Sequence, residues 1–180
     1  MVSGISFEER KLCATVIGKW YKHRINIAKF FAKNHPNDLD CYGADNKILG
    51  TMYKGKIPGF FYSKEKIDTL INYRFSICFE NKTNLNGYIS EKIFACFEGG
   101  CIPIYWGAMN IEKYIPKSCF IDYRDFATDE DLYQFICTMP KEKYQEYVDE
   151  IKRYLQSEEA KIFSPEFFDN IIYKAITDDS

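Results

Sequence analysis

The sequence lacks the features of several large classes of protein. Its 24 Lys and Arg against 26 Asp and Glu give a net charge of −2, which argues against a general nucleic-acid binder, since that needs a basic face. No apolar run approaches the roughly 20 residues of a transmembrane helix. The longest, Cys101 to Met109, is broken by Pro103 and Gly107. Charges at 8–11 come too early for the apolar core of a secretory signal, so none is expected. With 17% aromatic residues, the 180-residue chain is instead expected to fold.

The sequence is also poor in patterns that bind metals and cofactors. It has only two histidines and no C-x-x-C pair, so no zinc site is predicted. The glycine-rich fingerprints of dinucleotide sites and P-loops are both missing. Asp38 and Asp40 form a D-x-D, a pattern that binds a divalent metal in one class of sugar transferases, but short acidic patterns are common by chance. We interpret this one as a surface loop and expect neither a metal ion nor a cofactor.

The seven cysteines are an odd number, and most stand in apolar runs such as FSICFE and CIPIYW. A free cysteine in such surroundings behaves as a small buried apolar residue. The sequence therefore predicts reduced thiols in the core, which mildly favours a reducing compartment.

Apolar runs and helical periodicities alternate along the chain. Strands are predicted at 12–18, 39–42, 75–79, 101–106 and 119–122. Helices are predicted at 22–34, from Ser63 to Asn72, at 91–97 after Ser90 as N-cap, after a Thr128–Asp131 capping box, at 141–156, and from Ser164-Pro165. Strands separated by helices predict an α/β fold with a doubly wound, Rossmann-like, mainly parallel sheet and a helical C-terminal tail, in a single domain over 1–180.

The first candidate site follows the strand predicted at 12–18. In open parallel sheets, ligands bind beyond the carboxyl ends of the strands, where a loop leads into a helix. This turn carries Lys19, Lys22, His23 and Arg24 into a helix, and helix N-termini attract anions. A phosphate site and an ordinary solvated helix start both remain open here, and composition alone favours the second.

The second candidate site follows the strand predicted at 75–79. Lys92 lies in the first turn of the next helix, where a cation opposes the helix dipole. We interpret this as a sign that an anion sits between Lys92 and the free backbone N–H groups. We expect the replacement of Lys92 by alanine to leave the stability of the fold unchanged or slightly higher. Glu91 can accept paired hydrogen bonds from a ribose or sugar diol, and Asn81 and Tyr88 border the same crevice. Each of these three residues also has an ordinary structural explanation: Asn81 as a turn residue, Tyr88 as a packing residue and Glu91 as a favourable acid in the first turn of a helix.

Residues 73–126, YRFSICFENKTNLNGYISEKIFACFEGGCIPIYWGAMNIEKYIPKSCFIDYRDF, closely resemble the donor-binding lobe of the family 10 glycosyltransferases, the α-1,3/α-1,4-fucosyltransferases. The signature of that family runs F-E-N-[ST], G-Y-x-[ST]-E-K, P-[IV]-Y-W-G and F-I-[DN]-x-x-D-F, and every block is present in order. There are two departures: Lys82 separates Asn81 from Thr83, and Ser90 stands where Thr is usual. The segments on either side, with the basic turn, resemble the same lobe more loosely.

The resemblance implies a two-lobed fold of the B type, in which this chain is the C-terminal, donor-binding lobe. It also implies GDP-fucose as the donor and inverting transfer, without a metal, to a hydroxyl of an oligosaccharide or glycan acceptor. Carried over residue by residue, Arg24 and Lys92 would hold the diphosphate, and Asn81, Tyr88 and Glu91 would contact ribose and sugar. Two cations and a helix N-terminus can stabilise a departing diphosphate, which removes the need for a metal.

The general base of this family lies in the N-terminal lobe, and the first strand of the donor lobe follows Met1 almost directly. No residue here is therefore assigned as the base. We expect the chain to be either a fragment or a short natural protein, and we expect an N-terminal acceptor lobe to be supplied in cis or in trans. Two alternatives remain open: the same lobe with another nucleotide sugar, such as a pentose donor, and a non-catalytic nucleotide-sugar-binding module. The expected location is the cytoplasm of a bacterial or viral system, or the Golgi lumen for a fragment of an anchored enzyme.

Overall fold

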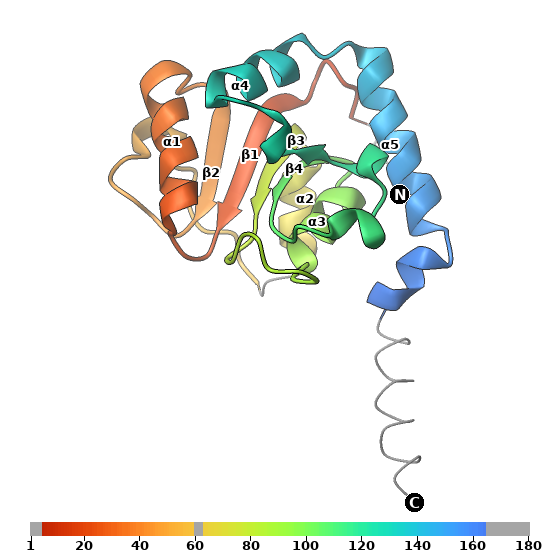
Figure 1. Ribbon diagram of the computed structural model, residues 1–180. Coiled ribbons are helices and arrows are strands. Elements are labelled where there is room, and N and C mark those ends of the chain that lie inside the picture. The colour runs from red at the N-terminus through yellow and green to blue at the C-terminus, as the bar shows by residue number, and fades with distance from the viewer. Residues whose placement is uncertain (1–4, 60–62, 165–180) are drawn as a thin grey trace, which may run out of the picture.

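A five-stranded parallel sheet forms the centre of the computed structural model, which describes residues 5–59 and 63–164 (Figure 1). The strands are β1 (Lys11–Ile17), β2 (Leu39–Gly43), β3 (Tyr73–Phe79), β4 (Ile102–Trp106) and β5 (Ile121–Asp122). They are ordered β2-β1-β3-β4-β5, and every neighbouring pair is parallel. The chain leaves β1 towards β2 and returns to the other side of β1 for β3. The strand order therefore reverses between β1 and β3, and such switch points are where doubly wound sheets bind ligands.

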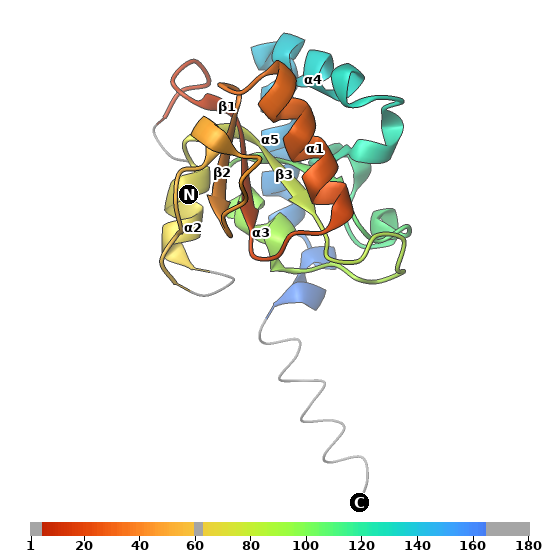
Figure 2. The same ribbon diagram turned by 90° about the vertical axis from the view of Figure 1, so that its left-hand side faces the viewer.

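Helices cover both faces of the sheet (Figure 2). They are α1 (Lys22–Asn34), α2 (Lys64–Leu70), α3 (Glu91–Glu98), α4 (Asp129–Thr138) and α5 (Lys141–Leu155). Helices α1 and α4 pack on one face, α2 and α3 pack on the other, and α5 contributes side chains to both cores. None of the helices in the described part of the chain is long and apolar enough to cross a membrane.

The strands divide their side chains between two apolar cores. In β3, Phe75 and Ile77 belong to the core under α1 and α4, whereas Cys78 belongs to the core under α2 and α3. In β4, Ile104 and Tyr105 divide in the same way. Successive side chains of a strand point to opposite faces, so a strand covered on both faces is apolar throughout. This is why continuous apolar runs, rather than alternating ones, marked the strands.

The predicted element order is confirmed over the described residues, with shifts at the ends. Helix α1 lies at the predicted residues, and Ser63 caps α2 by accepting a hydrogen bond from the Lys66 backbone N–H. The Thr128–Asp131 capping box is confirmed. Strand β5 is shorter than predicted because Lys117–Cys119 forms a 3-10 turn. The helix predicted from Ser164-Pro165 lies outside the described residues.

The interpretation of Asp38 and Asp40 as a surface loop is wrong for Asp40. This residue lies in β2 and is buried, and its carboxylate accepts hydrogen bonds from Lys11 Nζ at 2.8 Å and from the Tyr73 hydroxyl at 2.7 Å. Asp38 accepts a hydrogen bond from the Tyr133 hydroxyl at 2.8 Å. Both carboxylates therefore join elements of the fold. Lys11 lies in β1 and Tyr73 lies in β3, so the local sequence could not reveal these two contacts.

The prediction that most cysteines lie in the core is confirmed, whereas their reduced state stays a prediction. All seven cysteines are free, and six of them are buried. Only Cys137 is partly exposed. The compartment itself stays a prediction.

Candidate functional site

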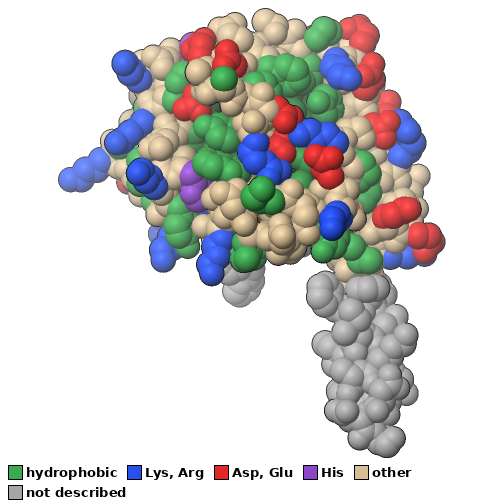
Figure 3. Space-filling view, in the orientation of Figure 1, with side chains coloured by type: hydrophobic (Ala, Val, Ile, Leu, Met, Phe, Trp, Pro, Cys, Tyr) green, Lys and Arg blue, Asp and Glu red, His purple; other side chains and the backbone are tan. Residues whose placement is uncertain are grey.

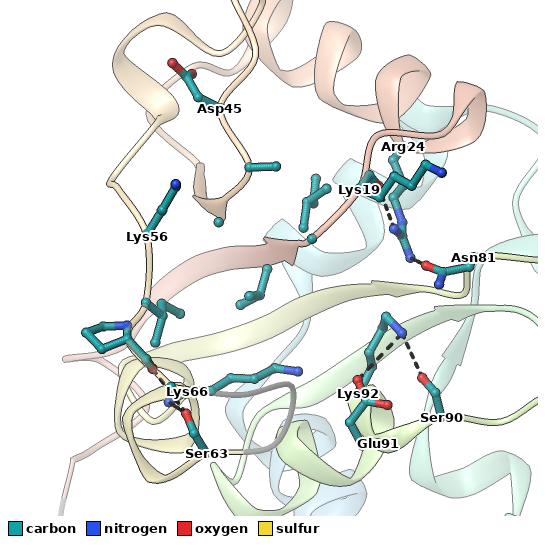
Figure 4. Close-up of a pocket in the computed structure, with 18 of the residues that line it drawn as sticks. Lys19, Arg24, Asp45, Lys56, Ser63, Lys66, Asn81, Ser90, Glu91 and Lys92 are labelled. Carbon is teal, nitrogen blue, oxygen red and sulfur yellow. Dashed lines mark hydrogen bonds and ion pairs between the residues drawn. The ribbon is translucent and has the colours of Figure 1, made fainter.

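A pocket of about 1080 Å³ opens at the carboxyl edge of the sheet, over the switch point between β1 and β3 (Figure 4). It is lined by the ends of β1 and β2, the segment before α2, and the starts of α1 and α3. All five residues that the sequence placed at a donor site contribute to this lining: Arg24, Asn81, Tyr88, Glu91 and Lys92. The two helix starts that the sequence presented as separate candidates thus belong to one pocket.

The lining of this pocket is cationic. Its charged residues are Lys19, Arg24, Lys56, Lys66 and Lys92 against Asp45 and Glu91. The excess of positive charge contrasts with the net charge of −2 of the whole chain. Figure 3 shows Lys and Arg side chains gathered to the left and lower left of one face, around α1. A cleft lined by charge of one sign concentrates ligands of the opposite sign, so the pocket suits an anion.

Arg24 extends from α1 and is held by three acceptors. Its Nη1 donates to the Lys19 carbonyl at 2.8 Å, and its Nη2 donates to Asn81 Oδ1 at 3.0 Å and to the Phe79 carbonyl. The residue is only 4% exposed, and this burial lowers the pKa of its guanidinium group. None of the three acceptors carries a charge, and the negative charge of Glu80 opposes this lowering of the pKa. The side chain is thus fixed in place at the border of the pocket.

Lys92 has a buried anionic partner. Its Nζ lies 3.2 Å from Glu80 Oε2 and donates to Ser90 Oγ at 2.8 Å. Glu80 is 0% exposed at the end of β3, where it also accepts from the Ser90 backbone N–H at 2.7 Å and from the Ser90 hydroxyl at 2.8 Å. A buried carboxylate of the protein is therefore one reason for a cation in this first turn, which the sequence analysis did not foresee. The binding of an anion by Lys92 stays a prediction.

Ser90 occupies the N-cap position of α3, but its side chain makes no capping hydrogen bond. Its hydroxyl instead connects Glu80 to Lys92. The predicted cap is thus correct in position and wrong in contact. Ser90 helps to hold the charged pair that borders the pocket.

Glu80 is one of the residues at the site that the sequence analysis missed. A signal was present, because Glu80 directly continues a strand that is buried on both faces, and a carboxylate is almost never buried without a partner. The surroundings of Glu80 are also tight. A Cβ at Gly107, in the following P-I-Y-W-G block, would lie 2.6 Å from Glu80 Cγ.

Glu91 borders the pocket beside Lys92, and Figure 4 shows the two side chains close together at the start of α3. Glu91 Oε1 is 3.8 Å from Lys92 Nζ, and the Glu91 side chain is 33% exposed. Tyr88 approaches the pocket from the preceding loop, and its carbonyl accepts a hydrogen bond from the Tyr105 hydroxyl at 3.3 Å. The side of the pocket formed by Tyr88 and Glu91 therefore offers a carboxylate and polar groups to a ligand.

The basic residues at 19–24, most of which lie in the first turn of α1, have two kinds of position. Lys19 and Arg24 line the pocket, whereas Lys22 and His23, both described, lie outside its lining. The His23 ring contacts the Glu80 carbonyl through Nε2 at 2.9 Å, and burial lowers the pKa of its imidazole. His23 therefore joins the start of α1 to the end of β3.

Among residues 5–59 and 63–164, no group of three or more His, Cys, Asp or Glu side chains is arranged to hold a metal ion. Metal-independent chemistry stays a proposal, which is tested below.

Comparison with known proteins identifies the family. Residues 8–168 match the model of glycosyltransferase family 10 (fucosyltransferase), C-terminal part. The chain belongs to this family. The resemblance inferred from the four motif blocks is thus confirmed.

Curated relatives of this glycosyltransferase family 10 chain are themselves fucosyltransferases. It is 29% identical over 177 residues to the alpha-(1,3)-fucosyltransferase FucT of Helicobacter pylori, a match that covers 94% of this chain and 36% of the relative. It is 26% identical over 137 residues to the human 4-galactosyl-N-acetylglucosaminide 3-alpha-L-fucosyltransferase FUT6, covering 73% of this chain and 34% of the relative. The chain thus spans about a third of the length of these two relatives.

Solved structures confirm the parallel α/β fold. A crystal structure of an alpha1,3-fucosyltransferase with GDP matches with a TM-score of 0.60 and 25% identity, covering 78% of this chain and 38% of that one. A second, with GDP-fucose, matches with a TM-score of 0.57 and 24% identity, with the same coverage.

Proposed function

We propose that this chain is the donor-binding lobe of a fucosyltransferase and that it binds GDP-fucose for inverting transfer to a hydroxyl of a glycan acceptor, without a metal ion. The observation that carries the proposal is the cationic pocket at the switch point, where Arg24 and Lys92 lie on either side of the end of β3. The similarity to fucosyltransferases solved with GDP and with GDP-fucose supports this choice of nucleotide.

In this proposal Arg24 and Lys92 bind the diphosphate. Negative charge grows on the diphosphate as its bond to the sugar breaks, and cations already in place stabilise that charge without reorganising. Three acceptors hold Arg24, and Glu80 and Ser90 hold Lys92. Both cations are therefore fixed before a ligand binds.

Asn81, Tyr88 and Glu91 contact the ribose and the sugar in this proposal. An ionised carboxylate accepts hydrogen bonds only, and its two oxygens can each accept one hydroxyl of a diol. The carboxylate of Glu91 lies at the border of the pocket, where both of its oxygens can accept hydroxyl groups in this proposal. Asn81 has a second role, because its Oδ1 holds Arg24.

The proposal is tested by measuring nucleotide binding. Thermal unfolding is recorded with GDP and with UDP, each in the presence and absence of EDTA. A ligand at 100 times its Kd stabilises the folded state by about 2.7 kcal/mol. We expect a larger shift with GDP than with UDP and no effect of EDTA. A preference for UDP would favour another nucleotide sugar, and loss of binding in EDTA would contradict a metal-free site. Binding of neither nucleotide would contradict the proposed function.

The replacement Glu91→Gln tests the diol contact. A hydrogen bond to a charged group contributes about 1.5–3 kcal/mol, so donor affinity should fall by roughly tenfold or more while the unfolding midpoint stays the same. Calorimetry with GDP and GDP-fucose separates the two contacts, because only the second ligand carries the sugar. The matched control is Glu98→Gln, at the exposed far end of the same helix. Intact affinity combined with lost turnover would indicate that Glu91 acts in catalysis instead.

A further inference from the structure

A third cation, Lys66, reaches the pocket from α2. It precedes the motif blocks and was not singled out in the sequence. The residue is only 8% exposed and belongs to the lining of the pocket. Figure 4 shows its side chain extending into the pocket towards Glu91 and Lys92, from the wall that lies across the pocket from Arg24.

The burial of Lys66 is unusual for its residue type. Lysine is almost never buried this deeply, because taking an ammonium group out of water is costly. Lys64, two residues earlier on the same helix, shows the ordinary arrangement: its side chain is 82% exposed and pairs with Asp68. The charge of Lys66 also acts on the core. Burial raises the pKa of the Cys78 thiol, and the positive charge of Lys66 opposes that rise.

The charge balance of the pocket shows what Lys66 adds. The charge of Lys92 is compensated by buried Glu80, and Glu91 lies 3.8 Å from the same ammonium group. The hydrogen bonds of Arg24 go to carbonyl and amide oxygens, which carry no charge. A diphosphate brings more than one negative charge, and Arg24 faces it from one wall. Lys66 supplies positive charge from the other wall.

We propose that Lys66 is a further phosphate-binding residue, whose ammonium group donates to a diphosphate oxygen of the bound nucleotide from the wall opposite Arg24. The inference rests on the proposed function, because it requires a nucleoside diphosphate in this pocket. The inference adds to the phosphate site a residue that lies outside the motif blocks, and it gives the diphosphate a contact on a second side of the pocket. The diphosphate is then held between two walls of the pocket.

The replacement Lys66→Met tests this inference, since methionine keeps an unbranched apolar stem and removes the charge. Calorimetry is carried out with GDP, guanosine and inorganic pyrophosphate. We expect affinity for GDP and pyrophosphate to fall at least about tenfold, while any binding of guanosine stays unchanged. The control Lys64→Met should bind all three ligands like the wild type. Wild-type affinity of Lys66→Met for GDP would overturn the inference, and so would an equal loss for guanosine.

Two further measurements keep the test decisive. The unfolding midpoint of Lys66→Met is recorded beside each titration, so that a loss of affinity can be separated from a loss of folded protein. Should that variant fail to fold, Lys66→Arg, which keeps the charge, is compared with Lys66→Gln, which does not; equal affinities for GDP would overturn the inference. A preference of the wild type for UDP would contradict the GDP assignment alone, since pyrophosphate still tests Lys66. Failure of the wild type to bind GDP, UDP or pyrophosphate would overturn both proposals.

Discussion

Replacing Lys92 by alanine should weaken GDP binding at least about tenfold and lower the free energy of unfolding by about 3–5 kcal/mol. The first effect is the loss of a charge-assisted bond to phosphate. The second arises because Glu80, which is 0% exposed, would lose the cation that lies 3.2 Å from its carboxylate. Breaking a buried ion pair from one side leaves an uncompensated charge in the interior.

Urea unfolding and calorimetry separate the two effects of Lys92→Ala. The matched control is the double replacement of Glu80 by Gln and Lys92 by Met, which removes both charges and keeps side chains of similar size. We expect the double variant to recover most of the lost stability but not the affinity for GDP. Wild-type stability of Lys92→Ala would show that Glu80 does not depend on this cation. Wild-type affinity would remove Lys92 from the phosphate site.

This expectation reverses the one drawn from the sequence, and the reason is physical. A charge near a helix end interacts with the dipole by about 0.3–1 kcal/mol, which predicts a neutral or slightly stabilising replacement. A broken buried pair costs several times more. The partner, Glu80, stands in a different element, and only the packing of α3 against the end of β3 brings the two together.

The fold could be predicted from the sequence where a local signal was strong. Strands buried on both faces appear as apolar runs. The cap at Ser63 and the capping box at Thr128 mark helix starts, because each contact joins residues only three positions apart. Contacts between distant residues could not be predicted in this way. Asp40 is held by Lys11 of β1 and by Tyr73 of β3, so its local sequence alone predicted a surface position.

At the candidate site, too, residues close in sequence could be predicted and contacts between distant residues could not. The motif blocks identified the wall formed by β3 and α3, because those residues are close in sequence. The opposite wall comes from the segment before α2, which the sequence predicted mostly as a loop and which brings Lys56 to the pocket, and from α2 itself, which brings Lys66. Arg24 and Asn81 are 57 residues apart and meet only in the folded chain. The binding role of each residue stays a prediction until nucleotide affinities are measured.

The largest expected effect concerns transfer itself. Inverting transfer needs an acceptor hydroxyl, a base within hydrogen-bond reach of it, and a leaving group held on the opposite side. Among the described residues, the pocket offers the fixed cations that a leaving diphosphate needs, and its lining carboxylates are Asp45 and Glu91. In our proposal Glu91 binds a diol. We therefore expect the 180-residue chain alone to bind GDP-fucose weakly, on a face that no second lobe encloses, and to transfer fucose at no useful rate.

Fucose transfer is measured with GDP-fucose and an oligosaccharide that ends in galactosyl-N-acetylglucosamine, with and without the N-terminal part of the Helicobacter pylori relative, either fused or added as a separate chain. A positioned general base contributes about 10²–10⁴-fold to a rate, so a competent second lobe should raise transfer by at least about 100-fold. Lys92→Ala in the complemented protein serves as the control and should lower the rate again. Complementation that restores binding but no transfer would favour a non-catalytic module. Rapid transfer by the chain alone would place a base within these residues; Glu91→Gln and Asp45→Asn would then show which carboxylate removes the proton.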